Sequence, residues 1–149
     1  MCIRDRLDIT DSQRLGQVLD QYRPAAVFHA AAFKHVGLLE RQPLVALRNN
    51  ILGTHILAKL AREHQVDRVV LISTDKAVEP TNVMGATKRV AERLMEGHAL
   101  DTSGTRFISV RFGNVLGSSG SVVPIFQRQI ASGGPVTVRD SAPKRSGII

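Results

Sequence analysis

A short polar cluster, Ser73-Thr74-Asp75-Lys76, directly follows the apolar run formed by residues 69–72. Such a run is typical of a buried strand, and open parallel α/β sheets bind ligands outside the carboxyl ends of their strands. A carboxyl group beside an amine at that place could donate one proton and remove another, provided that burial or a nearby cation lowers the pKa of the lysine. The cluster therefore indicates general acid–base chemistry, although the same residues could simply start a turn.

Met84 and Lys88 come shortly afterwards, within a helical pattern. Because they are four residues apart, their side chains lie one turn apart on the same helix face. Lys88 is the cation that could lower the pKa of Lys76. Met84 has no ionisable oxygen, so any proton removal at this place would need Thr74 and Asp75.

Strand and helix patterns alternate along the rest of the chain. We expect strands at residues 7–9, 25–29, 68–73, 106–112 and 135–138, and helices at residues 12–22, 43–64, 84–100 and 122–131. This order predicts parallel βαβ units, and so an α/β fold with a Rossmann-like, doubly wound parallel sheet. The glycine-rich turn that follows the first strand of such folds is missing from the sequence. We therefore expect an incomplete sheet that lacks its first βαβ unit and a C-terminal substrate domain.

Composition excludes several classes of protein. The net charge is +7, but the basic residues are scattered, and one tyrosine and five phenylalanines offer few rings for base stacking, so no nucleic-acid partner is expected. A single cysteine excludes a disulfide framework and fits a reducing compartment. No histidine and cysteine cluster has metal-ligand spacing, so no metal is expected. No apolar run approaches the ~20 residues of a membrane-spanning helix.

The Ser-Thr-Asp-Lys cluster, followed by Met84-Gly85-Ala86-Thr87-Lys88, resembles the extended short-chain dehydrogenase/reductase superfamily. Members carry Tyr-x-x-x-Lys at the second place. In this chain Met84 stands at the tyrosine position. That substitution resembles one branch of the superfamily, the nucleoside-diphosphate-sugar 4,6-dehydratases of bacterial polysaccharide and glycan synthesis. The resemblance covers residues 7–138, which we interpret as a partial NAD(P)-binding domain, with residues 1–6 and 139–149 as non-native or unstructured ends.

This resemblance implies NAD(P) as cofactor and a UDP-sugar, above all UDP-N-acetylglucosamine, as substrate. The reaction would oxidise C4, remove the C5 proton with loss of the C6 hydroxyl, and return the hydride to C6. Asp75 would be the acid and Lys76 the C5 base, with Thr74 assisting Asp75 at the C4 hydroxyl. Lys88 would hold the nicotinamide ribose.

The resemblance also implies further contacts, each with a plainer alternative. The expected cofactor-binding residues are Asp8, Ile9, His29, Ala30, Ala31, Asn50, Ser73 and Lys88. The expected substrate-binding residues are Lys34, His35, Asn114 and Ser119. Asp8 could instead help to start the helix 12–22, Asn50 could belong to a polar helix face, and Lys34 could be a solvated lysine.

Two other functions stay open: a nucleotide-sugar epimerase of the same superfamily, and a non-catalytic nucleotide-binding module that lost the tyrosine. Leu44, Leu47, Ile51 and Ala58 share one apolar face of the helix 43–64. The resemblance implies that this helix and the helix 84–100 pair across a two-fold interface in a homo-oligomer of the full-length protein. We expect a cytoplasmic protein. Membrane attachment of the full-length protein, its native ends and the choice between NAD and NADP stay open.

Overall fold

The computed structural model describes residues 7–100, 104–113 and 122–136. The chain divides into two compact units, Met1–Gly113 and Asn114–Ile149. The first contains the sheet and the candidate site. The second contains one described helix, α6 (Val122–Ala131), which agrees with the expected bounds.

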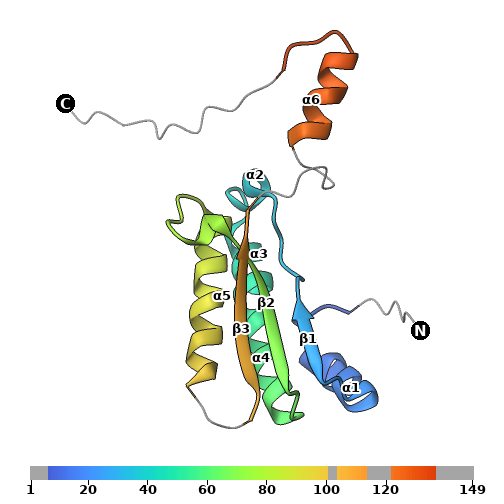
Figure 1. Cartoon of the computed structure of the whole chain (residues 1–149), viewed down its shortest axis with the longest axis vertical. Coiled ribbons are helices and arrows are strands. Elements are labelled where there is room, and N and C mark those ends of the chain that lie inside the picture. Colours follow the sequence, from blue (N-terminus) through green and yellow to red (C-terminus); the bar gives the residue numbers. More distant parts are fainter. Residues whose placement is uncertain (1–6, 101–103, 114–121, 137–149) are drawn as a thin grey trace, which may run out of the picture. The chain divides into compact units, whose positions relative to one another are not determined.

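The sheet of the first unit has three parallel strands in the order β1-β2-β3 (Figure 1). They are β1 (Ala26–His29), β2 (Arg68–Thr74) and β3 (Arg106–Phe112). The register pairs His29 with Leu71 and Ser73 with Arg111. Because the strands are parallel, their carboxyl ends lie at one edge of the sheet. This arrangement confirms the expected α/β class and the partial Rossmann fold.

Helices alternate with these strands as the sequence predicts. They are α1 (Ser12–Tyr22), α2 (Val36–Leu39), α3 (Pro43–Ala46), α4 (Gly53–Glu63) and α5 (Val83–Ala99). The polar residue before α1 and the one before α5 act as helix caps, because Asp11 accepts a hydrogen bond from the Arg14 amide and Asn82 accepts one from the Gly85 amide. A 3₁₀ turn, η2 (Asp75–Ala77), leaves β2 and carries the acid–base pair.

The hydrophobic core lies between the helices and one face of the sheet. Its buried residues are Leu15, Leu19, Leu57, Ala58, Ala61, Val66, Val69, Leu71, Ala91 and Met95. Strand residues of the opposite face stay open, with Phe28 71% exposed and Val110 43% exposed. Among the described residues of this unit, helices therefore cover one face of the sheet (Figure 1).

The expected helix 43–64 is helical throughout but is not one α-helix. A π-helical segment, η1 (Leu47–Leu52), joins α3 to α4. Only one end of the apolar stripe is buried, since Ala58 is fully buried whereas Leu44 is 77% exposed and Leu47 is 45% exposed. With the exception of Leu57, the residues that pack inward are small or polar: Ala46, Asn50, Gly53, Thr54, Leu57, Ala58 and Ala61.

Two expected strands are not formed as predicted. Residues 7–9 have no strand partner among the described residues, and the chain turns at Ile9 and Thr10. Asp8 causes this turn, since its carboxylate accepts hydrogen bonds from the amide and the hydroxyl of Thr10. Of the expected strand 135–138, Pro135 and Val136 are not in a strand, and the other two residues lie outside the described part. No helix in the described part is long and apolar enough to cross a membrane.

Candidate active site

Thr74, Asp75 and Lys76 form a hydrogen-bonded group at the carboxyl end of β2. The Thr74 hydroxyl donates to Asp75 Oδ1 at 2.8 Å, and Lys76 Nζ lies 3.0 Å from the same oxygen. The Lys76 amide also donates to Asp75 Oδ1 at 2.9 Å. The 3₁₀ turn thus gathers three donors on one carboxylate oxygen. These hydrogen bonds lower the pKa of Asp75 below its ordinary value, and the hydrogen bond from Thr74 has the largest effect. The exposed carboxyl is therefore ionised at neutral pH.

Lys88 lies one turn beyond Met84 on α5, and both side chains are buried. Lys88 Nζ donates to the carbonyl of Ile72, the residue before the polar cluster, at 2.7 Å. Burial lowers the pKa of Lys88, and the negative charge of Glu92 partly offsets that effect. The structure therefore brings Lys88 to the end of β2, as predicted.

His29, at the end of β1, is buried and neutral. Its Nε2 lies 2.8 Å from the Thr54 hydroxyl, which donates its own proton to the Asn50 carbonyl at 2.7 Å. Because that proton is already used, His29 Nε2 must be the protonated ring nitrogen. Burial, followed by the charge of Lys88, lowers the pKa of His29 to about 4. His29 is thus a structural donor in this arrangement, and its expected contact with the cofactor stays a prediction.

Asn50 fixes the loop that follows β1. It is 1% exposed, and its side chain pairs with both backbone groups of Phe33, accepting from the amide at 2.8 Å and donating to the carbonyl at 3.1 Å. It also donates to Thr87 of α5 at 3.0 Å. This asparagine, in the π-helical segment, braces the loop against the helix of Met84 and Lys88. π-Bulges are frequent at functional sites.

Gly85 allows the first turn of α5 to touch the turn that carries Asp75 and Lys76. A Cβ atom at Gly85 would lie 2.5 Å from the backbone oxygen of Lys76. Only glycine permits this contact without moving the backbone. The acid–base turn and the helix of Lys88 are therefore packed directly together.

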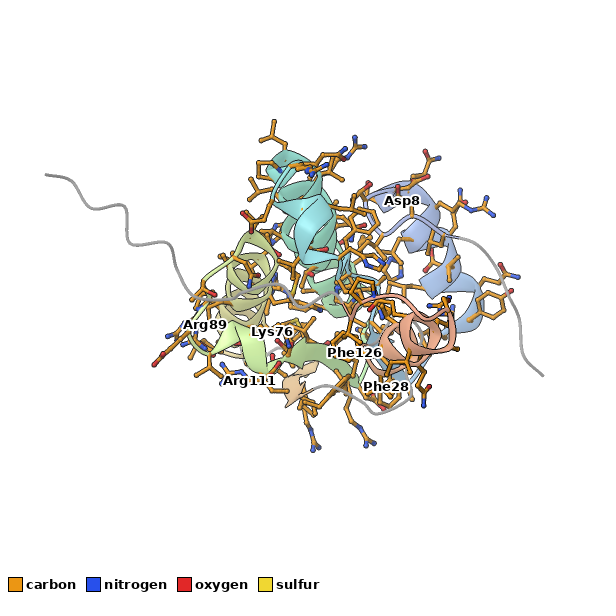
Figure 2. The ribbon with its side chains drawn as sticks, turned by 90° about the horizontal axis from the view of Figure 1, so that it is seen from above. Asp8, Phe28, Lys76, Arg89, Arg111 and Phe126 are labelled. Carbon is orange, nitrogen blue, oxygen red and sulfur yellow. The ribbon has the colours of Figure 1, made fainter. Side chains whose placement is uncertain are left out.

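Asp8 lies apart from this group, beside α1, whereas Lys76 and Arg111 lie on the α5 side (Figure 2). The hydrogen bonds from Thr10 lower the pKa of Asp8, so its exposed carboxylate is an anionic acceptor. Ile9 holds the turn in place by packing closely against Gly53. A Cβ atom added at Gly53 would lie only 2.5 Å from the side chain of Ile9.

The remaining expected contacts are less defined. Ala30 and Ala31 are exposed small residues after β1, and Lys34 and His35 are exposed on the following loop. Asn114 and Ser119 lie outside the described residues. No group of three or more histidine, cysteine, aspartate or glutamate residues in the described part could hold a metal ion.

Sequence reasoning missed the ion pair between the buried carboxylate of Glu92 and the partly exposed guanidinium of Arg111. Glu92 of α5 accepts two hydrogen bonds from the Arg111 guanidinium, at 2.8 and 2.7 Å, and one from Arg89 at 3.2 Å. Burial raises the pKa of Glu92, but these hydrogen bonds outweigh it and hold the pKa at about 2. Ser73 Oγ is buried, has no partner at hydrogen-bonding distance among the described residues, and lies close enough to Glu92 to help lower that pKa. The spacing of Glu92, four residues after Lys88, was the available signal.

Comparison with known proteins matches residues 4–147 to a family described as polysaccharide biosynthesis protein. The chain belongs to this family. Its site residues and fold make it an extended short-chain dehydrogenase/reductase, as the sequence predicts.

Three curated relatives bear on its activity. The chain is 56% identical over 131 residues to the capsular polysaccharide biosynthesis protein CapD of Staphylococcus aureus, covering 88% of this chain and 22% of that protein. It is 41% identical to a UDP-glucose 4-epimerase of Rickettsia rickettsii, covering 80% of this chain and 36% of that protein. It is 38% identical to an inverting UDP-N-acetylglucosamine 4,6-dehydratase of Campylobacter jejuni, covering 85% and 38%. The chain therefore spans less than half the length of these relatives.

Two solved structures share the fold. The structure of Pen from Bacillus thuringiensis has a TM-score of 0.84 at 43% identity, covering 90% of this chain and 41% of that one. A UDP-glucose 4-epimerase from Brucella ovis, solved in complex with NAD, has a TM-score of 0.71 at 28% identity, covering 80% and 40%. A structural relative of this chain thus binds NAD.

Proposed function

We propose that the full-length protein is an NAD(P)-dependent nucleotide-sugar 4,6-dehydratase that acts on UDP-N-acetylglucosamine. The observation that carries this proposal is the contact between Asp75 and Lys76, next to a buried Met84. An elimination needs one group to remove a proton and another to protonate the leaving hydroxyl. An adjacent carboxyl and amine supply both.

Two proton movements make the pair reactive. The ionised Asp75 takes the proton of the C4 hydroxyl through Thr74, whose hydroxyl lies 2.8 Å from Asp75 Oδ1, and so becomes the neutral acid. Lys76 acts as the base in its uncharged form, after its ammonium proton has passed to solvent, and it regains a proton from solvent once the product has left.

The neutral pair then balances the elimination. Lys76 takes the C5 proton, and Asp75 gives its proton to the C6 hydroxyl, which leaves as water. The reaction begins at the C4 hydroxyl, whose proton passes to the Thr74–Asp75 pair because Met84 offers no acceptor. Bound NAD(P) would take a hydride from C4 and return it to C6, and C5 then regains a proton from Lys76.

The residues present fit such a cofactor. Lys88 uses one N–H to bond the Ile72 carbonyl, which leaves a buried ammonium with further donors at the strand end. The buried Ser73 hydroxyl lacks a hydrogen-bond partner in the described part of the chain. Ala30 and Ala31 leave room for close approach at the end of β1. These groups would hold a nicotinamide ribose, and the ionised Asp8 would accept from an adenine amino group.

A 4-epimerase is the second candidate, because the chain is slightly more similar to a relative with that name than to the dehydratase relative. Met84 argues against it, since oxidation at C4 without elimination still needs a base, and the Asp75–Lys76 pair would have no use in a simple epimerisation. A non-catalytic binding module would need neither residue of that pair.

Product analysis separates the three functions. The full-length protein is incubated with UDP-N-acetylglucosamine and NAD⁺, and the sugar is examined by mass spectrometry and NMR. We expect loss of one water and a 4-keto-6-deoxy sugar. Conversion to an isomer of unchanged mass would identify an epimerase, and binding without conversion would identify a module.

A further inference from the structure

Glu92 is buried more deeply than the other charged side chains of the site, at 1% exposure compared with 8% for Lys88. It lies four residues after Lys88 on α5, so the two side chains share one helix face. Lys88 reaches the backbone of β2 at Ile72, and Glu92 reaches β3 at Arg111. The helix is therefore tied to both strand ends through adjacent turns.

We propose that Glu92 is a positioning residue for Lys88, and that the forked contact with Arg111 holds Glu92 in that role. This proposal depends on the proposed function in one respect, which is that Lys88 binds the cofactor. Two parallel N–H···O bonds fix both the distance and the rotation of a carboxylate and a guanidinium. Rotation or sliding of α5 against β3 would break this fork, so the fork fixes where Lys88 lies along β2.

The contact between Glu92 and Arg111 also holds the negative charge of Glu92 beside Lys88. Glu92 of α5 is the charged group that acts on Lys88, while Lys88 itself lowers the pKa of His29 of β1 and so helps to keep that histidine neutral. Arg111 of β3 and Arg89 of α5 are engaged by Glu92 itself. Burial disfavours the ammonium form of Lys88, and the Glu92 charge opposes that effect.

Stability alone is a weak reason for such a pair. The Glu92 side chain is 2% exposed and loses its hydration, whereas the Arg111 side chain is 39% exposed, so the pair must first offset the cost of burying the carboxylate. Helix α5 also carries an exposed ion pair, Arg93 with Glu96, at 2.7 Å. That pair serves as an internal comparison, since it lies on the same helix but away from Lys88.

The test uses the full-length protein with Glu92→Gln, and with Glu96→Gln as the matched control. The dissociation constant of NAD⁺ is measured against pH, and kcat and KM are measured with the sugar. Loss of the Glu92 charge lowers the pKa of Lys88 further, so Glu92→Gln should lose NAD⁺ affinity at a lower pH than the wild type. Loss of alignment should reduce kcat by about 10- to 100-fold. Glu96→Gln should match the wild type in both measurements.

Arg111→Lys separates the two effects. It keeps a positive partner for Glu92 but cannot form the fork. We expect reduced kcat with the pH dependence of NAD⁺ binding unchanged. If Glu92→Gln fails to fold, the double variant Glu92→Gln with Arg111→Gln also removes the guanidinium that Glu92→Gln leaves without its carboxylate, and should lose NAD⁺ affinity at lower pH as well.

Folded variants with wild-type kcat and wild-type pH dependence of NAD⁺ binding would overturn the proposal. The NAD⁺ measurement does not depend on the product. A protein that binds NAD⁺ but makes no 4-keto-6-deoxy sugar would therefore contradict the proposed function alone. The role of Glu92 would still be decided by the pH dependence of NAD⁺ binding.

Discussion

Asp75 and Lys76, neighbours in the sequence, also touch through their side chains, with Lys76 Nζ 3.0 Å from Asp75 Oδ1. Consecutive residues of a strand point to opposite faces of the sheet. The pair meets because β2 ends at Thr74 and the chain turns into a 3₁₀ helix. The end of a strand thus determines whether two neighbouring side chains can touch, which the proposed acid–base chemistry requires.

Lys76→Met in the full-length protein should abolish removal of the C5 proton, because it deletes the base without touching Lys88. Solvent-deuterium exchange at C5, followed by NMR, measures this step directly. Asp75→Asn should slow loss of the C6 hydroxyl by about 10²- to 10⁴-fold, the usual contribution of a general acid. Exchange at C5 that survives in Lys76→Met would refute the assigned base.

Gly85→Ala should lower kcat sharply while the protein stays folded. The added Cβ atom would stand 2.5 Å from the Lys76 carbonyl oxygen, so the turn carrying Asp75 and Lys76 must shift. Gly97→Ala on the same helix is the control, because no atom lies within 4 Å of its added Cβ. That change should leave kcat unaltered and stabilise the helix by about 0.5–1 kcal/mol. Equal kcat in both variants would contradict the tight packing at Gly85.

Asn50→Ala should destabilise the protein by about 2–4 kcal/mol, because it leaves both backbone groups of Phe33 and the Thr87 hydroxyl without their buried partner. Asn49→Ala, which removes a less buried amide that bonds the Ala31 carbonyl, should cost about 1 kcal/mol or less. Urea unfolding of the full-length protein compares the two. Similar losses would mean that Asn50 is only part of a polar helix face.

Acid should weaken the fold through His29. Its pKa is about 4 in the folded protein and 6.5 ordinarily, so the unfolded chain binds more protons between these values. The contribution of neutral His29 is complete above pH 6.5 and is lost as the pH falls from 6.5 to 4, by up to about 3 kcal/mol. His29→Gln should unfold with less pH dependence across that window. A wild type and variant with parallel pH curves would contradict the prediction.

Self-association of the full-length protein is expected through the exposed leucines of α3 and η1. Leu44 and Leu47 are 77% and 45% exposed, and Val90 of α5 is 42% exposed. Leu44→Glu should reduce the mass measured by light scattering, whereas Leu100→Glu, at a residue 86% exposed beyond the end of α5, should not. A wild type that is monomeric at all concentrations would exclude the oligomer.

Sequence reasoning succeeded where a pattern is local. The bounds of α1, β3 and α6 agree with the prediction, because each has a clear periodicity and its own start or stop signal. The placement of the Asp75–Lys76 pair and of Lys88 at the carboxyl end of β2 followed from the rule that sites form at carboxyl strand ends. The roles of these residues stay predictions.

Long-range contacts were the part that could not be predicted. Nothing local in the sequence indicates that Glu92 meets Arg111, nineteen residues later, because that pairing depends on how α5 packs on β3. The turn at Asp8 replaced an expected strand because a side-chain hydrogen bond to Thr10 outweighs the apolar pattern of residues 7–9. Periodicity showed which residues share a face but not how much of that face is buried: Leu44 and Leu47 are exposed, whereas Ala58 of the same stripe is buried.

The π-helical segment has a consequence for how this chain should be aligned with other proteins. A π-turn holds one more residue than an α-turn. Each residue after η1 is therefore one position later in the sequence than the residue at the same place in a purely α-helix. A relative whose corresponding helix is purely α would need a one-residue gap between Leu47 and Leu52. Deletion of one residue there would convert η1 into α-helix and keep the faces of α4, so that Thr54 still faces His29. Deletion of one residue from a purely α part of the same helix would instead rotate everything after it by about 100°.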